Sequence, residues 1–289
     1  MTIEVEVAEL LESWLAERLD ADQQVWLDER RSLLRSANSD KDLHITLGFI
    51  PRKLPRSDLN LSQDDLDNAH SIKPGWNPSD WTLHIAARVA VLCRQADRDP
   101  VEFGVLFQTL CRSADLAESM TLYRGTAVFP QTDVLNKQIA EGLRTNMRAV
   151  FEAIAHRNPY PKDYFDQNSW NHMVLKALFI DSTLAPIQGL DERANEELAT
   201  ILCDYAHERW AAGRLVTPEL WRCVGPFATG SMIDDLQKVV ESRTDNESNA
   251  GLLALQASGD PRAKKILTQH ADKLKRLNNS SVTWETIAL

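Results

Sequence analysis

Apolar residues recur at helical spacing along almost the whole chain, and this periodicity is the strongest constraint on its fold. Near the N-terminus, Ile3, Val7 and Leu11 repeat at intervals of four residues, which places them on one face of a helix. No extended block alternates apolar and polar residues with a period of two, so a sheet-based fold is not expected. The sequence therefore predicts an all-α fold. We expect one helical domain over residues 1–289, built as an irregular helical array.

One segment departs from this helical pattern. Residues 44–53 combine β-branched residues, a glycine and a proline, and a second proline follows at Pro55. Such residues are common in turns and extended segments. The sequence predicts a loop or an isolated extended piece here, with at most one short strand near residues 45–50.

The C-terminal part has a rhythm of its own. Residues 246–257 and 262–274 have the pattern of two antiparallel helices joined by a tight turn, which gives a helical hairpin over residues 246–274. Such a pair is typical of HEAT-like repeats, but a solenoid needs at least about three stacked units to bury a continuous core. A HEAT-like α-solenoid in the C-terminal part is therefore an open alternative within the all-α class.

Composition excludes several classes of function. The 289 residues carry a formal net charge of −10, which argues against nucleic-acid binding because phosphate neutralisation needs a basic surface. No apolar run approaches the roughly 20 residues of a transmembrane helix. The first residues lack the basic start of a signal peptide. The cysteines form no CxxC pair, so neither a zinc site nor a disulfide framework is expected. These features predict a cytoplasmic protein.

A polar stripe interrupts the apolar helix that we expect over residues 163–180. Asn171, His172 and Lys176 lie at positions that fall close together on one helical face, with Asn168 one turn earlier. The stripe can line a cavity, where Lys176 would hold an anion and His172 would exchange a proton. The alternative is a plain solvent-facing stripe without a ligand.

The helix expected over residues 191–212 carries a charged residue on its apolar stripe. Arg209 lies within that stripe, and Glu208 lies at its edge beside Asp204. Because an unpaired buried charge is very costly, we expect Arg209 to be buried and paired with an acid or an anionic ligand.

The same helix offers one combination of metal-ligand residue types. Asp204, His207 and Glu208 are neighbours at helical spacing. They lack the two histidines of an HExxH motif and an obvious further ligand, so no metal is predicted.

Other motifs for chemistry are missing. The sequence contains no glycine-rich phosphate loop, no GxSxG elbow and no repeated DxD pattern, so no cofactor is predicted. Arg144, Arg148 and Glu152 are spaced for surface ion pairs of small energy. Arg144 is nevertheless a candidate for adding positive charge to a ligand pocket.

Several stretches of the chain resemble the EboA family. The resemblance is dense over residues 122–227 and thin around residues 51–53. The strings that carry it are LYRG at 122–125, EGLRTNM at 141–147, RNPYP at 157–161, WNHMVLKA at 170–177, GLDERAN at 189–195, DYAHERWAAGR at 204–214 and PELWR at 218–222.

This resemblance implies a biological process without a reaction mechanism. EboA-like proteins are encoded in bacterial gene clusters with a prenyltransferase-like membrane protein, a dehydroquinate-synthase-like protein and TIM-barrel-like proteins. The clusters are associated with making a secondary metabolite or moving it toward the periplasm, and the family is described as a metabolite traffic protein. It supplies no established catalytic residues.

Three hypotheses follow from residues and resemblance together. The first is a small polar or anionic metabolite bound in a pocket between helices 163–180 and 191–212, near His172 and Lys176. The second is an enzyme that acts on this metabolite, with His172 or His207 as the acid or base. The third is a non-catalytic scaffold for other proteins of the same gene cluster.

Overall fold

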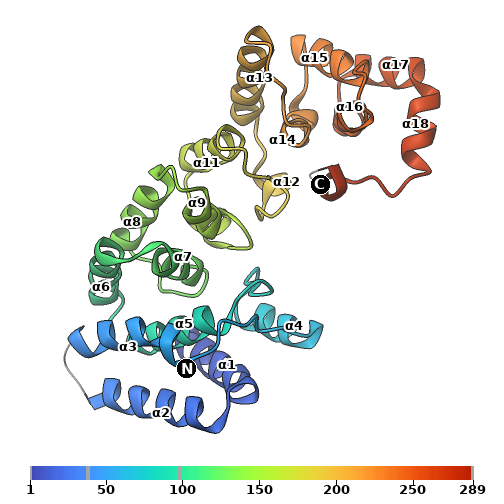
Figure 1. The fold of residues 1–289 in the computed structure, drawn as a ribbon. Coiled ribbons are helices and arrows are strands. Elements are labelled where there is room, and N and C mark those ends of the chain that lie inside the picture. Colours follow the sequence, from blue (N-terminus) through green and yellow to red (C-terminus); the bar gives the residue numbers. More distant parts are fainter. Residues whose placement is uncertain (1, 37–39, 97–98, 288–289) are drawn as a thin grey trace. The chain divides into compact units, whose positions relative to one another are not determined.

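The structure, a computed structural model, describes residues 2–36, 40–96 and 99–287. It is 72% helical, with 19 α-helices and no strand in the described part (Figure 1). One isolated antiparallel bridge joins Asp58 and Thr82. The prediction of an all-α fold is confirmed.

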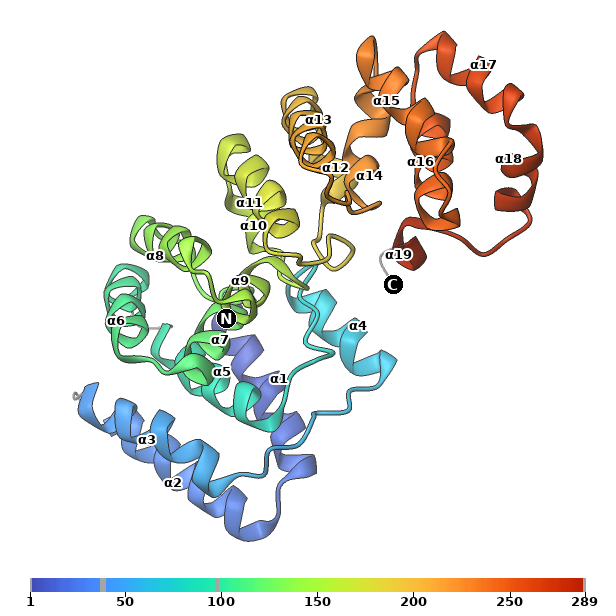
Figure 2. The ribbon, with the colours of Figure 1, turned by 45° about the horizontal axis from the view of Figure 1, so that its top comes forward.

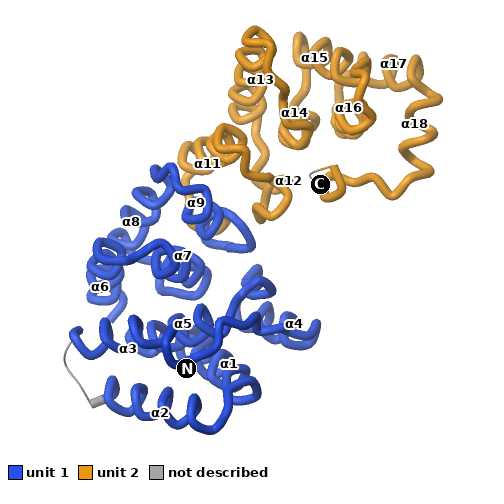
Figure 3. Tube along the Cα trace, in the orientation of Figure 1, with its two compact units in different colours: residues 1–161 blue, residues 162–289 orange. Residues whose placement is uncertain are grey.

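The chain forms two compact units (Figure 3). Unit 1 comprises Met1–Pro161 and unit 2 comprises Lys162–Leu289. The single helical domain over residues 1–289 stays a prediction.

Unit 1 contains the helices up to α9, and the short α10 (Tyr160–Tyr164) crosses the boundary between the units in the sequence. Its helices are α1 (Ile3–Arg18), α2 (Ala21–Ser36), α3 (Asp40–Lys53), α4 (Gln63–Ile72), α5 (Leu83–Ala96), α6 (Pro100–Ser113), α7 (Leu116–Gly125), α8 (Asp133–Arg144) and α9 (Arg148–Ala155).

Helix α5 lies at the centre of unit 1. It packs along α1 and also contacts α3, α6 and α7 (Figures 1 and 2). All but three of its residues are buried, because its apolar side chains face neighbours on every side. One of the buried residues is charged, and that residue is Arg88.

The structure corrects the prediction for residues 44–53, which form the second half of α3 and not a loop or strand. Leu43, Leu47 and Ile50 recur at helical spacing and are buried, so packing of this face outweighs the small propensity cost of the β-branched residues. Pro51 lies in the last turn of α3, where a proline disrupts fewer backbone hydrogen bonds than it would in the middle of the helix.

Unit 2 contains the remaining helices. They are α11 (Gln167–Phe179), α12 (Leu190–Arg193), α13 (Glu196–Ala211), α14 (Leu220–Val224), the 3₁₀ turn η1 (Gly225–Phe227), α15 (Ser231–Val240), α16 (Asp245–Ala257), α17 (Pro261–Gln269), α18 (Ala271–Asn278) and α19 (Trp284–Ile287).

Helix α16 is the main packing partner in the C-terminal part of unit 2. It contacts α14, α15, α17 and η1. The approach at Gly225 is close, since a Cβ atom there would lie 2.7 Å from the carbonyl oxygen of Ala254. Only glycine fits this position without movement of one of the two backbones.

The predicted C-terminal hairpin is present with one difference. Helices α16 and α17 pack on each other, and Asp260 caps α17 by accepting a hydrogen bond from the amide of Arg262 at 2.8 Å. The second helix does not continue to residue 274, because the chain leaves helical geometry at His270 and restarts as α18. The HEAT-like arrangement stays a prediction.

None of the helices in the described part of the chain has the length and apolar character needed to cross a membrane.

Candidate functional site

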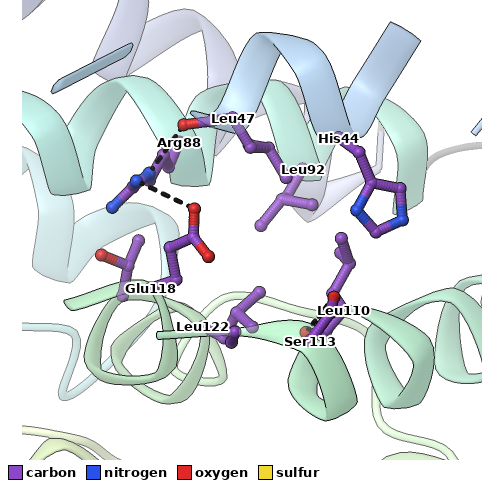
Figure 4. Close-up of a pocket in the computed structure, with 10 residues that line it drawn as sticks. His44, Leu47, Arg88, Leu92, Leu110, Ser113, Glu118 and Leu122 are labelled. Atoms are coloured by element: carbon purple, nitrogen blue, oxygen red, sulfur yellow. Dashed lines mark hydrogen bonds and ion pairs between the residues drawn. The ribbon is translucent and has the colours of Figure 1, made fainter. Parts of the chain in front are cut away.

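A pocket in unit 1 lies between α3, α5, α6 and α7 (Figure 4). Most of its wall is apolar, and Arg88 and Glu118 lie together at one side, with His44 at the other. Leucine side chains line the space between these polar ends: Leu47, Leu92, Leu110 and Leu122. A buried charge next to an apolar cavity is the arrangement that small-molecule sites use to orient a polar ligand group.

Arg88 is held by one bond to the backbone of α3. Only 5% of the residue is exposed, and its Nε donates to the carbonyl oxygen of Leu47 at 3.2 Å. That carbonyl would accept from the amide of residue 51 in a regular helix, but Pro51 has no N–H to donate. The guanidinium of Arg88 therefore satisfies a carbonyl that the proline leaves without a helical partner.

A second contact of Arg88 is an ion pair with α7. Its Nη2 lies 3.3 Å from Oε1 of Glu118. Glu118 is itself positioned by the start of its helix, since its other carboxylate oxygen accepts from the amide of Asp115 at 3.3 Å in a capping box. Burial lowers the pKa of Arg88, and the charges of Glu118 and Asp115 oppose this shift.

The closed part of the pocket is small. It leaves about 40 Å³ for the centres of water-sized atoms, which is room for a few waters or for one polar group of a ligand. Arg88 uses Nε and Nη2 in its contacts, and its Nη1 makes no hydrogen bond to any described residue. An acceptor such as a carboxylate or hydroxyl oxygen could therefore bond to the guanidinium from the pocket.

The polar stripe predicted on α11 divides between the interior and the surface. Asn171 is buried, with 1% exposed, and exchanges hydrogen bonds with Asn195, the residue that caps α13. Its Nδ2 also lies 3.3 Å from the carboxylate of Glu197. These partners give Asn171 a structural role that joins α11 to the start of α13.

The other two residues of this stripe are more accessible. His172 is exposed, and Lys176 is half-buried. Burial lowers the pKa of the Lys176 ammonium group. Neither residue lines the pocket around Arg88, so a ligand site at His172 and Lys176 stays a prediction.

The structure corrects the prediction for Arg209. The residue is half-buried, and its Nε donates to the carbonyl oxygen of Leu215 at 2.9 Å, beyond the end of α13. The guanidinium also lies 6.0 Å from the ring of Tyr205. No described acidic residue lies within ion-pair distance, because the side chain turns past the helix end toward the following loop instead of into the core.

This position predicts a small effect for Arg209→Ala. The change removes one partly exposed hydrogen bond, so the free energy of unfolding should fall by about 0.5–1.5 kcal/mol. Urea denaturation monitored by circular dichroism measures the loss. A loss above about 3 kcal/mol, typical of a broken buried ion pair, would contradict the position described here.

The remaining predicted residues lie apart from any one site. Asp204 and Glu208 are exposed, and His207 is bonded through Nε2 to Oδ2 of Asp235 on α15 at 2.7 Å. Arg144 is an exposed residue of unit 1, paired with Glu141. Within the described residues, no group of three or more metal-binding side chains is arranged to hold an ion.

A comparison with protein families identifies the chain. The model of the family described as metabolite traffic protein EboA matches residues 7–225 of the 289. The chain belongs to the EboA family. No curated protein and no solved structure matches the chain.

The EboA match reaches further than the dense resemblance in the sequence. It begins at residue 7, so it includes all helices that line the pocket around Arg88 and runs through α14 in unit 2. The helices from α15 onward lie beyond the matched region. The residues that line the pocket around Arg88 therefore all lie within the matched region.

Arg88 was not among the residues singled out from the sequence, although a signal was present. It is the single charged residue between Leu83 and Cys93 in a run of apolar residues that predicts deep burial. A charged residue in such a run needs a partner, by the same argument that we applied to Arg209. The partner itself could not be found from spacing, because Leu47 and Glu118 lie far from Arg88 in the sequence.

Proposed function

We propose that this EboA-family protein takes part in metabolite traffic by binding a small polar or anionic metabolite at the pocket of unit 1. The observation that carries the proposal is the buried guanidinium of Arg88 at the wall of a leucine-lined pocket. The family supports a small-molecule partner. The guanidinium of Arg88 gives the pocket a positive charge, and a polar group of such a partner can bind to it in a place that is shielded from water.

The chemistry of the lining suggests how the metabolite binds. An acidic or hydroxyl group would accept from Nη1 of Arg88, and the adjoining carbon skeleton would contact Leu92 and Leu122. Because the closed part is small, most of the metabolite would stay at the mouth, where α6 ends at Ser113. A ligand held in this way can be released, which transfer to a next protein requires.

Three parts of the proposal rest on the resemblance and the composition alone. The traffic would be directed toward the periplasm, and the chain would act in the cytoplasm. Other proteins of the gene cluster would receive or supply the metabolite.

The test fills the pocket without removing its charge. Ser113 is an exposed lining residue, so Ser113→Trp should occupy the mouth while the fold persists. We expect native mass spectrometry of the variant, purified from its own host, to show loss of the small molecule that the unchanged protein retains. The host should also lose accumulation of the metabolite.

The matched control is Ala117→Trp. Ala117 is exposed on α7 close in sequence to Ser113 but does not line the pocket. It should keep both the bound molecule and the accumulation. If Ser113→Trp behaves like this control, the pocket is not the binding site.

Three alternatives have their own outcomes in the same experiment. Loss of the molecule in Lys176→Met, with retention in Ser113→Trp, would move the site to α11. An enzyme using His207, whose bond to Asp235 is the observation that favours it, would release an altered molecule. Normal accumulation of the metabolite in the host, with no small molecule retained by the unchanged protein, would favour a scaffold for the cluster proteins.

A further inference from the structure

Unit 2 contains a larger pocket of its own, between α16 and α18, which can be found in Figure 2. It leaves about 190 Å³ for the centres of water-sized atoms, against about 40 Å³ in the pocket around Arg88. A single water needs only about 10–15 Å³ of such space, so a molecule of several non-hydrogen atoms fits. All lining residues lie beyond the region that matches the EboA family.

The wall formed by α18 carries two positive charges. Lys273 is half-buried, and its Nζ donates to the carbonyl oxygen of Val240 at 2.7 Å and to Oγ of Ser248 at 3.1 Å. Both acceptors are neutral, and the remaining N–H of the ammonium group has no acceptor in the described part of the chain. Arg276, about one turn later, is exposed and pairs with no acidic residue that the structure describes. Neither cation is therefore neutralised by a described carboxylate.

The wall formed by α16 carries a negative charge and an amide. Asp245 is exposed in the first turn of the helix and forms no ion pair within residues 2–36, 40–96 and 99–287. Asn249 lies one turn later and is half-buried, and its side-chain amide makes no hydrogen bond to any described residue. The anion on α16 and the cations on α18 thus line one space without pairing with each other. A ligand with opposite charges of its own can satisfy both walls.

We propose that this pocket binds a free α-amino acid with a small aliphatic side chain. The carboxylate of the amino acid would accept from Arg276 and Lys273, and its ammonium group would donate to Asp245. The side chain would contact Leu277 and Val282, the apolar members of the lining. A purely anionic ligand would be repelled by the acid and a purely cationic one by the two bases, so a zwitterion fits best. This site lies in the other unit and goes beyond the proposed function.

The experiment titrates the full-length protein with L-valine and with two analogues that each lack one of its charged groups. Isovalerate lacks the ammonium group and isobutylamine lacks the carboxylate, and both keep the branched carbon chain. Isothermal titration calorimetry at constant ionic strength should give saturable binding of L-valine. Each analogue should bind at least about tenfold more weakly, the effect of one lost charge-assisted contact. The thermal midpoint of unfolding should rise with the concentration of L-valine.

Asp245→Asn is the deciding variant, because it removes the charge that would hold the ammonium group and keeps a side chain of the same size at an exposed position. It should weaken the binding of L-valine about tenfold. It should not weaken the binding of isovalerate, which has no ammonium group. Asp272→Asn is the matched control: it removes the same charge from an exposed position on α18 outside the pocket lining and should change the affinity by less than about twofold.

Arg276→Gln tests the opposite wall. It should weaken L-valine and isovalerate alike by about tenfold, since both ligands present a carboxylate. Lys275→Gln, at the neighbouring exposed position outside the lining, should change neither affinity by more than about twofold. Lys273 is kept unchanged, because its ammonium group also joins α18 to Val240 and Ser248.

Four results would each overturn the proposal. L-valine does not bind saturably, or one of the two analogues binds as tightly as L-valine does. Asp245→Asn weakens isovalerate as much as L-valine, so the acid does not hold the ammonium group. Asp245→Asn and Arg276→Gln weaken the binding no more than their controls, so any effect comes from net charge and not from the pocket.

Discussion

Replacing Arg88 with methionine is expected to lower the free energy of unfolding by about 3–5 kcal/mol, the usual effect of removing one partner from a buried ion pair. Methionine fills much of the space but leaves two acceptors without a donor. These are the carbonyl oxygen of Leu47 and the carboxylate of Glu118, which Arg88 contacts at 3.2 and 3.3 Å. Urea denaturation, monitored by circular dichroism, measures the loss.

A second substitution tests the reason for this effect. Pro51→Ala restores an N–H that can donate to the carbonyl of Leu47, four residues earlier in α3. In that background Arg88→Met should cost about 1 kcal/mol less than in the unchanged protein, the net contribution of one hydrogen bond. Arg112→Met, at an exposed position, should cost less than about 0.5 kcal/mol. A loss at Arg88 as small as that control would contradict the buried contacts.

Glu219→Ala is expected to lower the free energy of unfolding by about 3 kcal/mol in unit 2, since two amides lose their acceptor. The residue is 2% exposed, and Oε1 accepts from the amides of Leu184 and Ala185 at 2.9 and 2.8 Å. Both amides belong to the segment between α11 and α12, so one carboxylate joins that segment to α14. Thermal or urea unfolding measures the loss.

Glu219 also predicts a pH dependence. Burial raises the pKa of its carboxyl group above the ordinary value of 4.5, although the two amides and Arg222 partly offset this. The folded state therefore holds the proton more tightly than the unfolded state. The stability contributed by this proton is complete below about 4.5 and is lost as the pH rises through the raised pKa of the folded state.

Glu219→Gln is the matched control for both effects. Its amide oxygen can still accept from Leu184 and Ala185, so it should lose less stability than Glu219→Ala at neutral pH. It cannot ionise, so the part of the pH slope above 4.5 that belongs to Glu219 should disappear. If the pH dependence of the free energy of unfolding is the same in this variant as in the unchanged protein, burial does not shift the pKa of the Glu219 carboxyl group.

Some helix starts are encoded locally, in the residues just before the helix. Asp260-Pro261 starts α17 in the structure as the pattern predicts, with the aspartate as the cap and the proline in the first turn. Residues 44–53 show where such local signals fail. Its composition favours an extended piece, but Leu43, Leu47 and Ile50 obtain burial against the rest of unit 1 by forming a helix.

The two arginines on apolar stripes show why the candidate site was harder to predict. Helical spacing gives the direction in which a side chain leaves its own helix, but not what lies in that direction. Arg209 leaves α13 near its end and turns back to the carbonyl of Leu215, so it avoids burial in the core. Arg88 leaves the middle of α5 and has no such route, so it is covered by α3 and α7.

Periodicity and matching strings along the chain were enough to predict the all-α class and the resemblance to the EboA family. Which polar residues are buried, and which of them contact one another, depends on tertiary packing. The bond between Arg88 and Leu47 joins residues 41 positions apart, and the ion pair between Arg88 and Glu118 joins residues 30 positions apart. Contacts of this kind depend on which helices pack together, and that packing depends on the apolar faces of all the helices at once.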